Sequence, residues 1–240
     1  LPYIDPIIFQ IGPLVIRWYG LTWLIGVSLI YLAANIRTRE RDNWNDEQLQ
    51  ELMFYGLLGA IIGGRLGYMI FYSFSELIQN PMSLFYVWQG GLSFHGGLIG
   101  VLLFILIFSK SKWSSSFFET TDFIAPAIPL GLGSVRIGNF LNYELLGRPT
   151  SSFLGVIYPN DPLQLTRHPS QIYQAFSEGF ILFIFLIWFA KKDRPIKSIS
   201  ALFLIGYGII RFITEFFREP DLHIGFDLYE ILTRGQILCI

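Results

Sequence analysis

The chain has 240 residues, of which 52% are hydrophobic and only 15% are charged, and its mean hydropathy is +0.50. These values lie outside the range of an ordinary soluble domain. The formal net charge is -1 and no cluster of basic residues stands out, which argues against a nucleic acid as a partner. A single cysteine excludes an internal disulfide framework. Composition therefore predicts a single membrane domain over residues 1–240.

Apolar blocks long enough to cross a membrane recur along the chain. A hydrocarbon core of about 30 Å requires about 20 helical residues. Six complete membrane-spanning helices are expected at residues 14–36, 52–72, 92–108, 123–142, 171–190 and 199–217, and a seventh would begin near Gly235 and be cut short at Ile240. Residues 143–170 are too polar to cross and are expected to form a small external head segment. The expected fold is all-α and polytopic, with seven transmembrane helices, the last one truncated.

The basic residues between these spans predict the orientation of the chain. Nine Lys and Arg residues lie in the first, third and fifth links, and only four lie in the fourth and sixth. Because cytoplasmic loops carry the excess of Lys and Arg, we expect the N-terminus outside and the C-terminus inside.

The second span carries small residues at four-residue spacing. Two such rows occur: Gly56, Ala60 and Gly64, and Gly59, Gly63 and Gly67. This spacing allows the backbones of two membrane helices to approach closely, so it predicts tight helix packing.

Four arginines are expected inside the spans: Arg17, Arg65, Arg136 and Arg211. A charge within the membrane is costly and usually marks a functional path or a paired buried charge. With the orientation above, these arginines and His95 all fall toward the outer leaflet. The asymmetry predicts a polar cavity at the depth of the outer phospholipid headgroups, with an anion as its natural ligand.

The sixth span carries Tyr207, Arg211, Glu215 and Arg218 along one helical face. Two interpretations are open. Glu215 could simply neutralise the charge of Arg211, or it could orient the planar guanidinium so that it holds a phosphate and stabilises developing charge.

His95 lies at the start of the third span, among glycines that would let another group approach closely. It could act as a hydrogen-bonding element or as a base. The sequence shows no HxxE, CxxC or clustered acidic pattern, so neither a metal site nor a cofactor is expected. It also lacks the GxSxG pattern of a serine hydrolase.

The string RIGNFLNYELLGR at residues 136–148 resembles the signature of bacterial prolipoprotein diacylglyceryl transferases. The resemblance extends along the whole chain through IRWYGL at 16–21, GRLGY at 64–68, HGG at 95–97, HPSQIY at 168–173 and REPD at 218–221. One departure is Gln174, which stands where the family usually has a glutamate.

The resemblance implies a reaction, two substrates and a location. The diacylglyceryl group of phosphatidylglycerol would be transferred to the thiol of the lipobox cysteine in a prolipoprotein signal peptide, with release of glycerol 1-phosphate. This step begins lipoprotein maturation. The protein would be a multi-pass protein of the bacterial cytoplasmic (inner) membrane, working as a monomer with its active site facing the outer leaflet.

The resemblance also assigns roles to individual residues. Arg136 would bind the lipid phosphate in a pocket shaped by Asn139 and Glu144. Arg211, oriented by Glu215, would be the second essential cation. Tyr19 and Tyr207 would donate hydrogen bonds to the headgroup, Arg65 would join this binding set, and His95 would be the base for the thiol.

Two other classes of function compete with the transferase. A lipid or anion transporter would also carry arginines within its spans, but no inverted pair of broken helices is evident in the sequence. A structural or assembly subunit would leave the buried cations unexplained.

Overall fold

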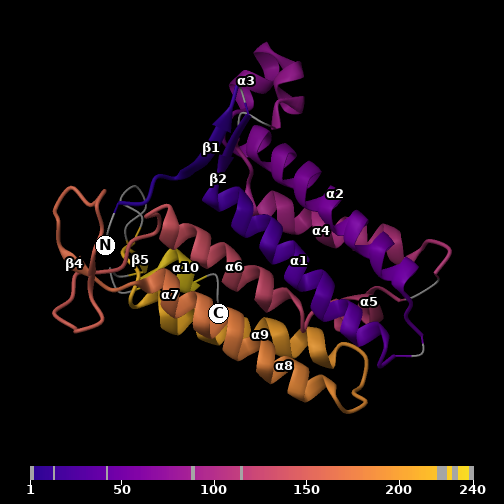
Figure 1. Ribbon diagram of the computed structural model, residues 1–240. Helices are drawn as coiled ribbons and strands as arrows, with labels where there is room; N and C mark the ends of the chain where they lie inside the picture. The colour runs from indigo at the N-terminus through magenta and orange to yellow at the C-terminus, as the bar shows by residue number, and fades with distance from the viewer. Residues whose placement is uncertain are drawn as a thin grey trace. The chain divides into compact units, whose positions relative to one another are not determined.

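A computed structural model of the protein describes residues 3–12, 14–41, 43–87, 90–113, 116–220, 226–228 and 232–237, and its ribbon is drawn in Figure 1. The chain forms two compact units. The first unit contains residues 1–33 and 124–240, and the second contains residues 34–123.

Four helical runs in the described residues are long and apolar enough to cross a membrane. They are α1 (Trp18–Thr38), α2 (Asp46–Phe71), the continuous run Ser170–Ala190 and α9 (Ser198–Glu215). Two shorter helices, α5 (Phe117–Ile124) and α6 (Ile128–Leu141), pass the same test only as a pair. The protein is therefore mostly helical, with the character of a polytopic membrane protein.

The expected number of seven spans stays a prediction. The third expected span is the apolar helix α4 (Phe94–Ser109), which has only 16 residues. Of the seventh expected span, the structure describes only residues 235–237, which lie in the short helix α10 (Arg234–Ile237). A two-stranded hairpin of β5 (Phe226–Leu228) and β6 (Leu232–Thr233) precedes α10.

The first expected span begins later than the hydropathy suggested. Residues before Trp18 form an antiparallel hairpin of β1 (Ile7–Ile11) and β2 (Leu14–Arg17), with Gln10 opposite Val15 and a turn at Gly12, where φ is +58°. Arg17 is the last residue of β2 and is exposed, so it precedes the helix in which it was expected, and its depth in the membrane stays a prediction. A short strand of β-branched and aliphatic residues can be as apolar as a segment of membrane helix, so hydropathy alone does not distinguish a strand from a helix here.

The fourth expected span, residues 123–142, is broken in two. Helix α5 ends at Ile124, residues 125–127 form a turn, and α6 starts at Ile128. Pro126 and Pro129 explain the break, because proline has no backbone N–H to donate and its ring clashes with the preceding helical turn. Pro129 is tolerated because it falls in the first turn of α6.

Glycine packing between α2 and α4 organises the second unit. A Cβ atom placed on Gly59 would lie 2.6 Å from the carbonyl oxygen of Gly100, and one on Gly67 would lie 2.7 Å from the Cα atom of Gly96. The predicted close packing is confirmed for the row Gly59, Gly63 and Gly67, whose partners are Gly96 and Gly100 of α4, whereas Gly56 of the other row has nothing within 4 Å of a Cβ position. Two short elements follow α2: α3 (Phe74–Gln79) and the 3₁₀ helix η1 (Pro81–Phe85).

In the first unit, α6 and α9 lie beside the run Ser170–Ala190 (Figure 1). This run consists of α7 (Ser170–Gln174), a π-helical segment η3 (Ala175–Ile181) and α8 (Leu182–Ala190). A Cβ atom on Gly179 would lie 2.8 Å from the Cα atom of Gly133, so these two glycines allow η3 to touch α6. The start of α1 is joined to α6 by Ser134 Oγ, which donates to the carbonyl of Thr22 at 2.7 Å.

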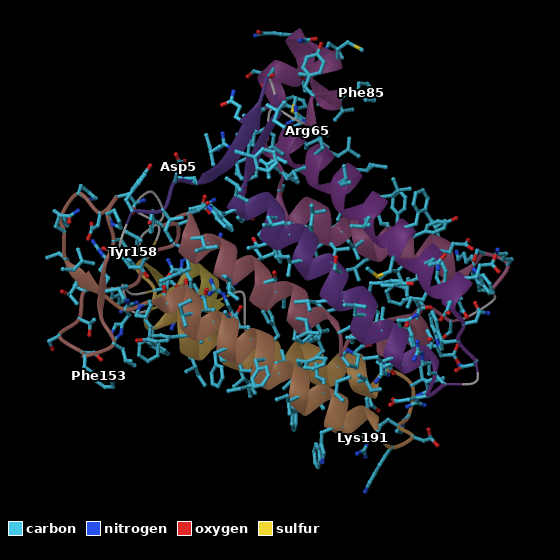
Figure 2. The ribbon with its side chains drawn as sticks, viewed as in Figure 1. Asp5, Arg65, Phe85, Phe153, Tyr158 and Lys191 are labelled. Atoms are coloured by element: carbon cyan, nitrogen blue, oxygen red, sulfur yellow. The ribbon has the colours of Figure 1, made fainter. Side chains whose placement is uncertain are left out.

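Between α6 and α7 the chain forms irregular structure with a small hairpin of β3 (Val156–Ile157) and β4 (Thr166–Arg167). Tyr158, marked in Figure 2, is fully buried, and its hydroxyl donates to Gln171 Oε1 at 2.9 Å. This stretch corresponds to the expected head segment, residues 143–170. Its place outside the membrane stays a prediction.

Candidate functional site

Two of the expected arginines meet at one carboxylate in the first unit. Arg136 on α6 donates from Nε to Glu178 Oε2 at 3.2 Å, and its Nη2 atom lies 3.1 Å from the same oxygen. Arg211 on α9 approaches the other oxygen, with Nη1 3.8 Å from Glu178 Oε1. The Glu178 side chain is completely buried, whereas those of Arg136 and Arg211 are 16% and 11% exposed. Glu178 therefore lies between two guanidinium groups that come from different helices.

Glu215 pairs with Arg211 from the opposite side. Arg211 Nη2 lies 2.7 Å from Glu215 Oε2, one turn along α9. The other oxygen, Oε1, accepts a hydrogen bond from Thr233 Oγ1 at 3.3 Å and lies 3.7 Å from Arg218 Nη1. The expected pairing of Arg211 with Glu215 is thus present, and it extends to Arg218.

We call Arg136, Glu178, Arg211, Glu215 and Arg218 the arginine cluster. It contains three guanidinium groups and two carboxylates. Burying such groups in an apolar environment is expensive, and the mutual attraction of buried ion pairs often does no more than offset the cost. Stability alone therefore gives no reason to place them there, and charges buried in this way often mark a functional site.

The signature string ends beside this cluster. The Arg148 backbone N–H donates to the carbonyl of Phe217 at 2.9 Å, and the Glu219 N–H donates to the carbonyl of Leu146 at 3.0 Å. Arg148 Nε also donates to the carbonyl of Arg218 at 3.0 Å. These bonds hold the segment that follows α6 against the end of α9.

The expected pocket residues Asn139 and Glu144 contact each other. Asn139 Nδ2 donates to Glu144 Oε2 at 3.1 Å, and the backbone N–H of Glu144 donates to the Asn139 carbonyl at 2.9 Å. Asn142 Nδ2 donates to the second carboxylate oxygen, Oε1, at 3.3 Å. Asn139 is one turn beyond Arg136 on α6, so the pair continues the polar line that starts at the arginine cluster.

The two expected tyrosines also lie along α6. Tyr207 of α9 interacts with the Arg136 guanidinium. The ring of Tyr19 packs at Gly138, where a Cβ atom would lie 3.4 Å from Tyr19 Cδ2. Both residues are half-buried, and both contact the helix that carries Arg136.

Arg65 belongs to the second unit and holds backbone carbonyls. Nε donates to Leu84 at 3.2 Å, Nη2 donates to Ser83 at 2.5 Å, and Nη1 donates to Gly90 at 2.6 Å and to Gly91 at 3.2 Å. Figure 2 marks Arg65 in the last third of α2, near the segment that carries Phe85. These bonds give Arg65 a role in shaping the link between α2 and α4, and its expected contact with phosphatidylglycerol stays a prediction.

His95 also belongs to the second unit, at the start of α4. Its imidazole is exposed and lines a cavity of about 390 Å³ with Phe71, Tyr72 and Ser93. Ser93 caps α4 by accepting a hydrogen bond from Gly96 N at 3.3 Å, which fixes the backbone next to His95. No described residue of this unit hydrogen-bonds the imidazole, and its expected role as a base stays a prediction.

The reasoning from sequence missed Glu178. It is the only charged residue of the expected span 171–190. The arginines stand out because a charge inside an apolar block is costly and needs a reason. The same argument, applied to acidic residues, identifies Glu178. Among the described residues, no group of three or more His, Cys, Asp or Glu side chains could hold a metal ion.

Comparison with known proteins gives consistent matches over the full chain. The family model described as prolipoprotein diacylglyceryl transferase matches residues 6–240. Proteins named phosphatidylglycerol–prolipoprotein diacylglyceryl transferase from Acinetobacter baylyi and Coxiella burnetii are 51% and 50% identical to the chain. These matches cover 100% of this chain and 88% and 91% of the two relatives. The chain thus belongs to the prolipoprotein diacylglyceryl transferase family.

Proposed function

We propose that the arginine cluster binds the phosphate of phosphatidylglycerol while the diacylglyceryl group is transferred to a prolipoprotein. Membership of the family makes the chain a transferase of lipoprotein maturation, with phosphatidylglycerol and prolipoprotein as its substrates. The single observation that carries the proposed site is the convergence of Arg136 and Arg211, from two helices, on one buried carboxylate.

The chemistry of the transfer requires positive charge at this phosphate. The thiol of the lipobox cysteine loses its proton, its sulfur forms a bond to the glycerol carbon, and the bond from that carbon to the phosphate oxygen breaks. The electron pair of the broken bond stays on glycerol 1-phosphate, so negative charge grows there. A guanidinium can donate two parallel hydrogen bonds to such a group, and preorganised donors stabilise charge as it develops.

Asn139, Glu144, Tyr19 and Tyr207 would shape the headgroup pocket. Each of them lies on α6, follows it directly or packs against it. Arg65 would join the residues that bind phosphatidylglycerol, in addition to the carbonyl groups that it already holds in the link between α2 and α4.

His95 would take the proton of the thiol. A thiol with a pKa near 8.5 is mostly protonated at neutral pH and must be converted to the thiolate to react. The exposed imidazole at the cavity edge, with no hydrogen-bond partner among the described residues of its own unit, supports this role. The site would face the outer leaflet of the cytoplasmic membrane in a monomeric protein whose N-terminus lies outside.

The test is a mass assay in vesicles. The purified protein would be reconstituted with phosphatidylglycerol and a synthetic lipobox peptide, and the peptide should gain the mass of one diacylglyceryl group. A peptide with Ser in place of the lipobox Cys should gain none. Movement of labelled phosphatidylglycerol between leaflets, without any gain of mass on the peptide, would instead support a transporter.

A further inference from the structure

Glu178 contacts two arginines at once. Its oxygens are divided between two arginines: Oε2 faces Nε and Nη2 of Arg136, and Oε1 faces Nη1 of Arg211. Thr214 Oγ1 on α9 lies 3.2 Å from Oε1 and 3.2 Å from the Arg211 carbonyl oxygen, so its hydroxyl can donate to either of them. A single side chain therefore sets the positions of two guanidinium groups relative to each other.

The backbone is shaped to deliver this side chain. Glu178 lies inside the π-helical segment η3, and such segments are rare and occur frequently at functional sites. The next residue, Gly179, meets Gly133 of α6 without any side chain between the two backbones. Arg136 is one turn beyond Gly133, so this close approach brings Arg136 and Glu178 within hydrogen-bonding distance.

One donor of the pair is left for a ligand. Arg211 Nη1 is buried and has no hydrogen-bond partner in the described part of the chain, and at 3.8 Å its approach to Glu178 is an electrostatic contact. Arg211 Nη2 is already occupied by Glu215. A phosphate oxygen that entered beside Arg136 and Arg211 could accept a hydrogen bond from Nη1, which the described residues leave unsatisfied.

We propose that Glu178 is a positioning residue that sets the spacing and orientation of Arg136 and Arg211 so that both can donate to one phosphate. This inference rests on the proposed function of the arginine cluster. Glu178 does not touch the reacting atoms in this account. It acts through the two arginines, and its effect should appear in turnover more than in lipid binding.

Two substitutions of Glu178 distinguish a role in aligning the two arginines from a role in neutralising their charge. Glu178→Gln keeps the length of the side chain but removes its negative charge. It also replaces one carboxylate oxygen, an acceptor, with an NH2 group, a donor that would face an arginine. The charge of the cluster rises, so attraction for the anionic lipid is kept, whereas the alignment of the two guanidinium groups is lost. Glu178→Asp keeps the charge but is one methylene shorter, so it cannot reach both arginines equally.

The measurements are kcat, expressed per folded molecule, and KM for phosphatidylglycerol. Thermal unfolding in detergent checks that each variant folds. We expect Glu178→Gln to lower kcat by roughly 100-fold, the scale of a misplacement of about 1 Å, with KM changed by less than about threefold. Glu178→Asp should lower kcat by roughly tenfold on the same scale. Ser177→Ala is the matched control in η3, because its hydroxyl only donates to the Tyr173 carbonyl of its own helix, and it should leave both constants unchanged.

The outcomes distinguish this inference from the proposed function. Glu178→Asp supplies the test if Glu178→Gln does not fold. Full kcat per folded molecule in either variant, with Arg136→Lys inactive, would overturn the positioning role alone. If Arg136→Lys is itself fully active, the proposed phosphate site fails first. A loss of folded protein with unchanged kcat per folded molecule would show that Glu178 serves stability only.

Discussion

Arg211 Nη2 and Glu215 Oε2 lie 2.7 Å apart across one turn of α9, and both side chains are almost completely buried. Glu215 also accepts from Thr233, while Arg211 retains one nitrogen without a hydrogen-bond partner in the described residues. The pair therefore does more than cancel charge: the carboxylate occupies one edge of the guanidinium and leaves another nitrogen for a ligand. This arrangement favours the interpretation in which Glu215 orients Arg211.

Glu215→Gln should lower activity, because its amide nitrogen can face Arg211 Nη2 and turn the guanidinium away. We expect a loss of kcat/KM of roughly 10- to 100-fold, the scale of a misplaced preorganised donor. The vesicle assay with phosphatidylglycerol and lipobox peptide measures it. Glu76→Gln is the control, since Glu76 is exposed on α3 and should tolerate the change. Unchanged activity of Glu215→Gln would leave only the charge-balancing interpretation.

Arg136→Lys should be inactive although it keeps the positive charge. Lysine offers a point charge on a flexible stem instead of a planar fork, so it cannot hold Glu178 through two nitrogens and donate to a phosphate as well. The expected loss of kcat is roughly 100- to 1,000-fold, as when a donor to a developing oxyanion is removed. Retained turnover in the same assay would exclude bidentate phosphate binding by Arg136.

His95→Asn distinguishes a base from a positioning group. Asparagine keeps hydrogen-bonding capacity but cannot take the thiol proton, so loss of base catalysis should lower kcat by roughly 10²- to 10⁴-fold. The remaining activity should rise with pH as the peptide thiol ionises without help. Near-normal turnover at neutral pH would remove His95 from the chemistry and leave it as part of the cavity wall.

The sequence predicted the arginine cluster only in part, for physical reasons. Arg136 and Arg211 stand out because charge in an apolar block is costly, and Glu215 follows from helical spacing on the same face. The pairing of Arg136 with Glu178 depends on how two glycines bring α6 and η3 together, which spacing within one helix does not show. The four carbonyl partners of Arg65 lie 18 to 26 residues away, in a link without any periodicity.

Glycine packing between α2 and α4 predicts that two alanine substitutions in α2 differ in their effect on thermal stability. Gly56→Ala meets nothing within 4 Å and gains helix propensity, whereas Gly59→Ala places a methyl group 2.6 Å from the Gly100 carbonyl oxygen. Overpacking of this kind typically costs about 1–3 kcal/mol. Thermal unfolding in detergent should show a lower midpoint for Gly59→Ala and an equal or higher midpoint for Gly56→Ala. Equal midpoints for the two variants would mean that the helices separate easily.

The stretch between α6 and α7 should lose its structure in acid because of one ion pair. Arg167 Nε donates to Asp161 Oδ2 at 2.7 Å and Nη2 donates to Oδ1 at 3.2 Å, and both side chains are buried. The hydrogen bond from Arg167 is the main cause that lowers the pKa of Asp161, and the backbone N–H groups of Leu163 and Leu165 add to it. The folded state therefore binds the Asp161 proton less readily than the unfolded state does.

The stabilisation from this carboxylate is complete above the ordinary aspartate pKa of about 3.9 and is lost as the pH falls through the lower pKa of the folded state. Hydrogen exchange of residues 143–169 between pH 7 and pH 3 should show protection that falls below about pH 4. Asp161→Asn cannot titrate, so its protection should be lower at neutral pH and much less dependent on pH. Asp5→Asn, at an exposed aspartate, should keep the profile of the unsubstituted protein. If Asp161→Asn keeps the same acid transition, another carboxylate controls it, and Glu219, which pairs with Arg167, would be the next residue to substitute.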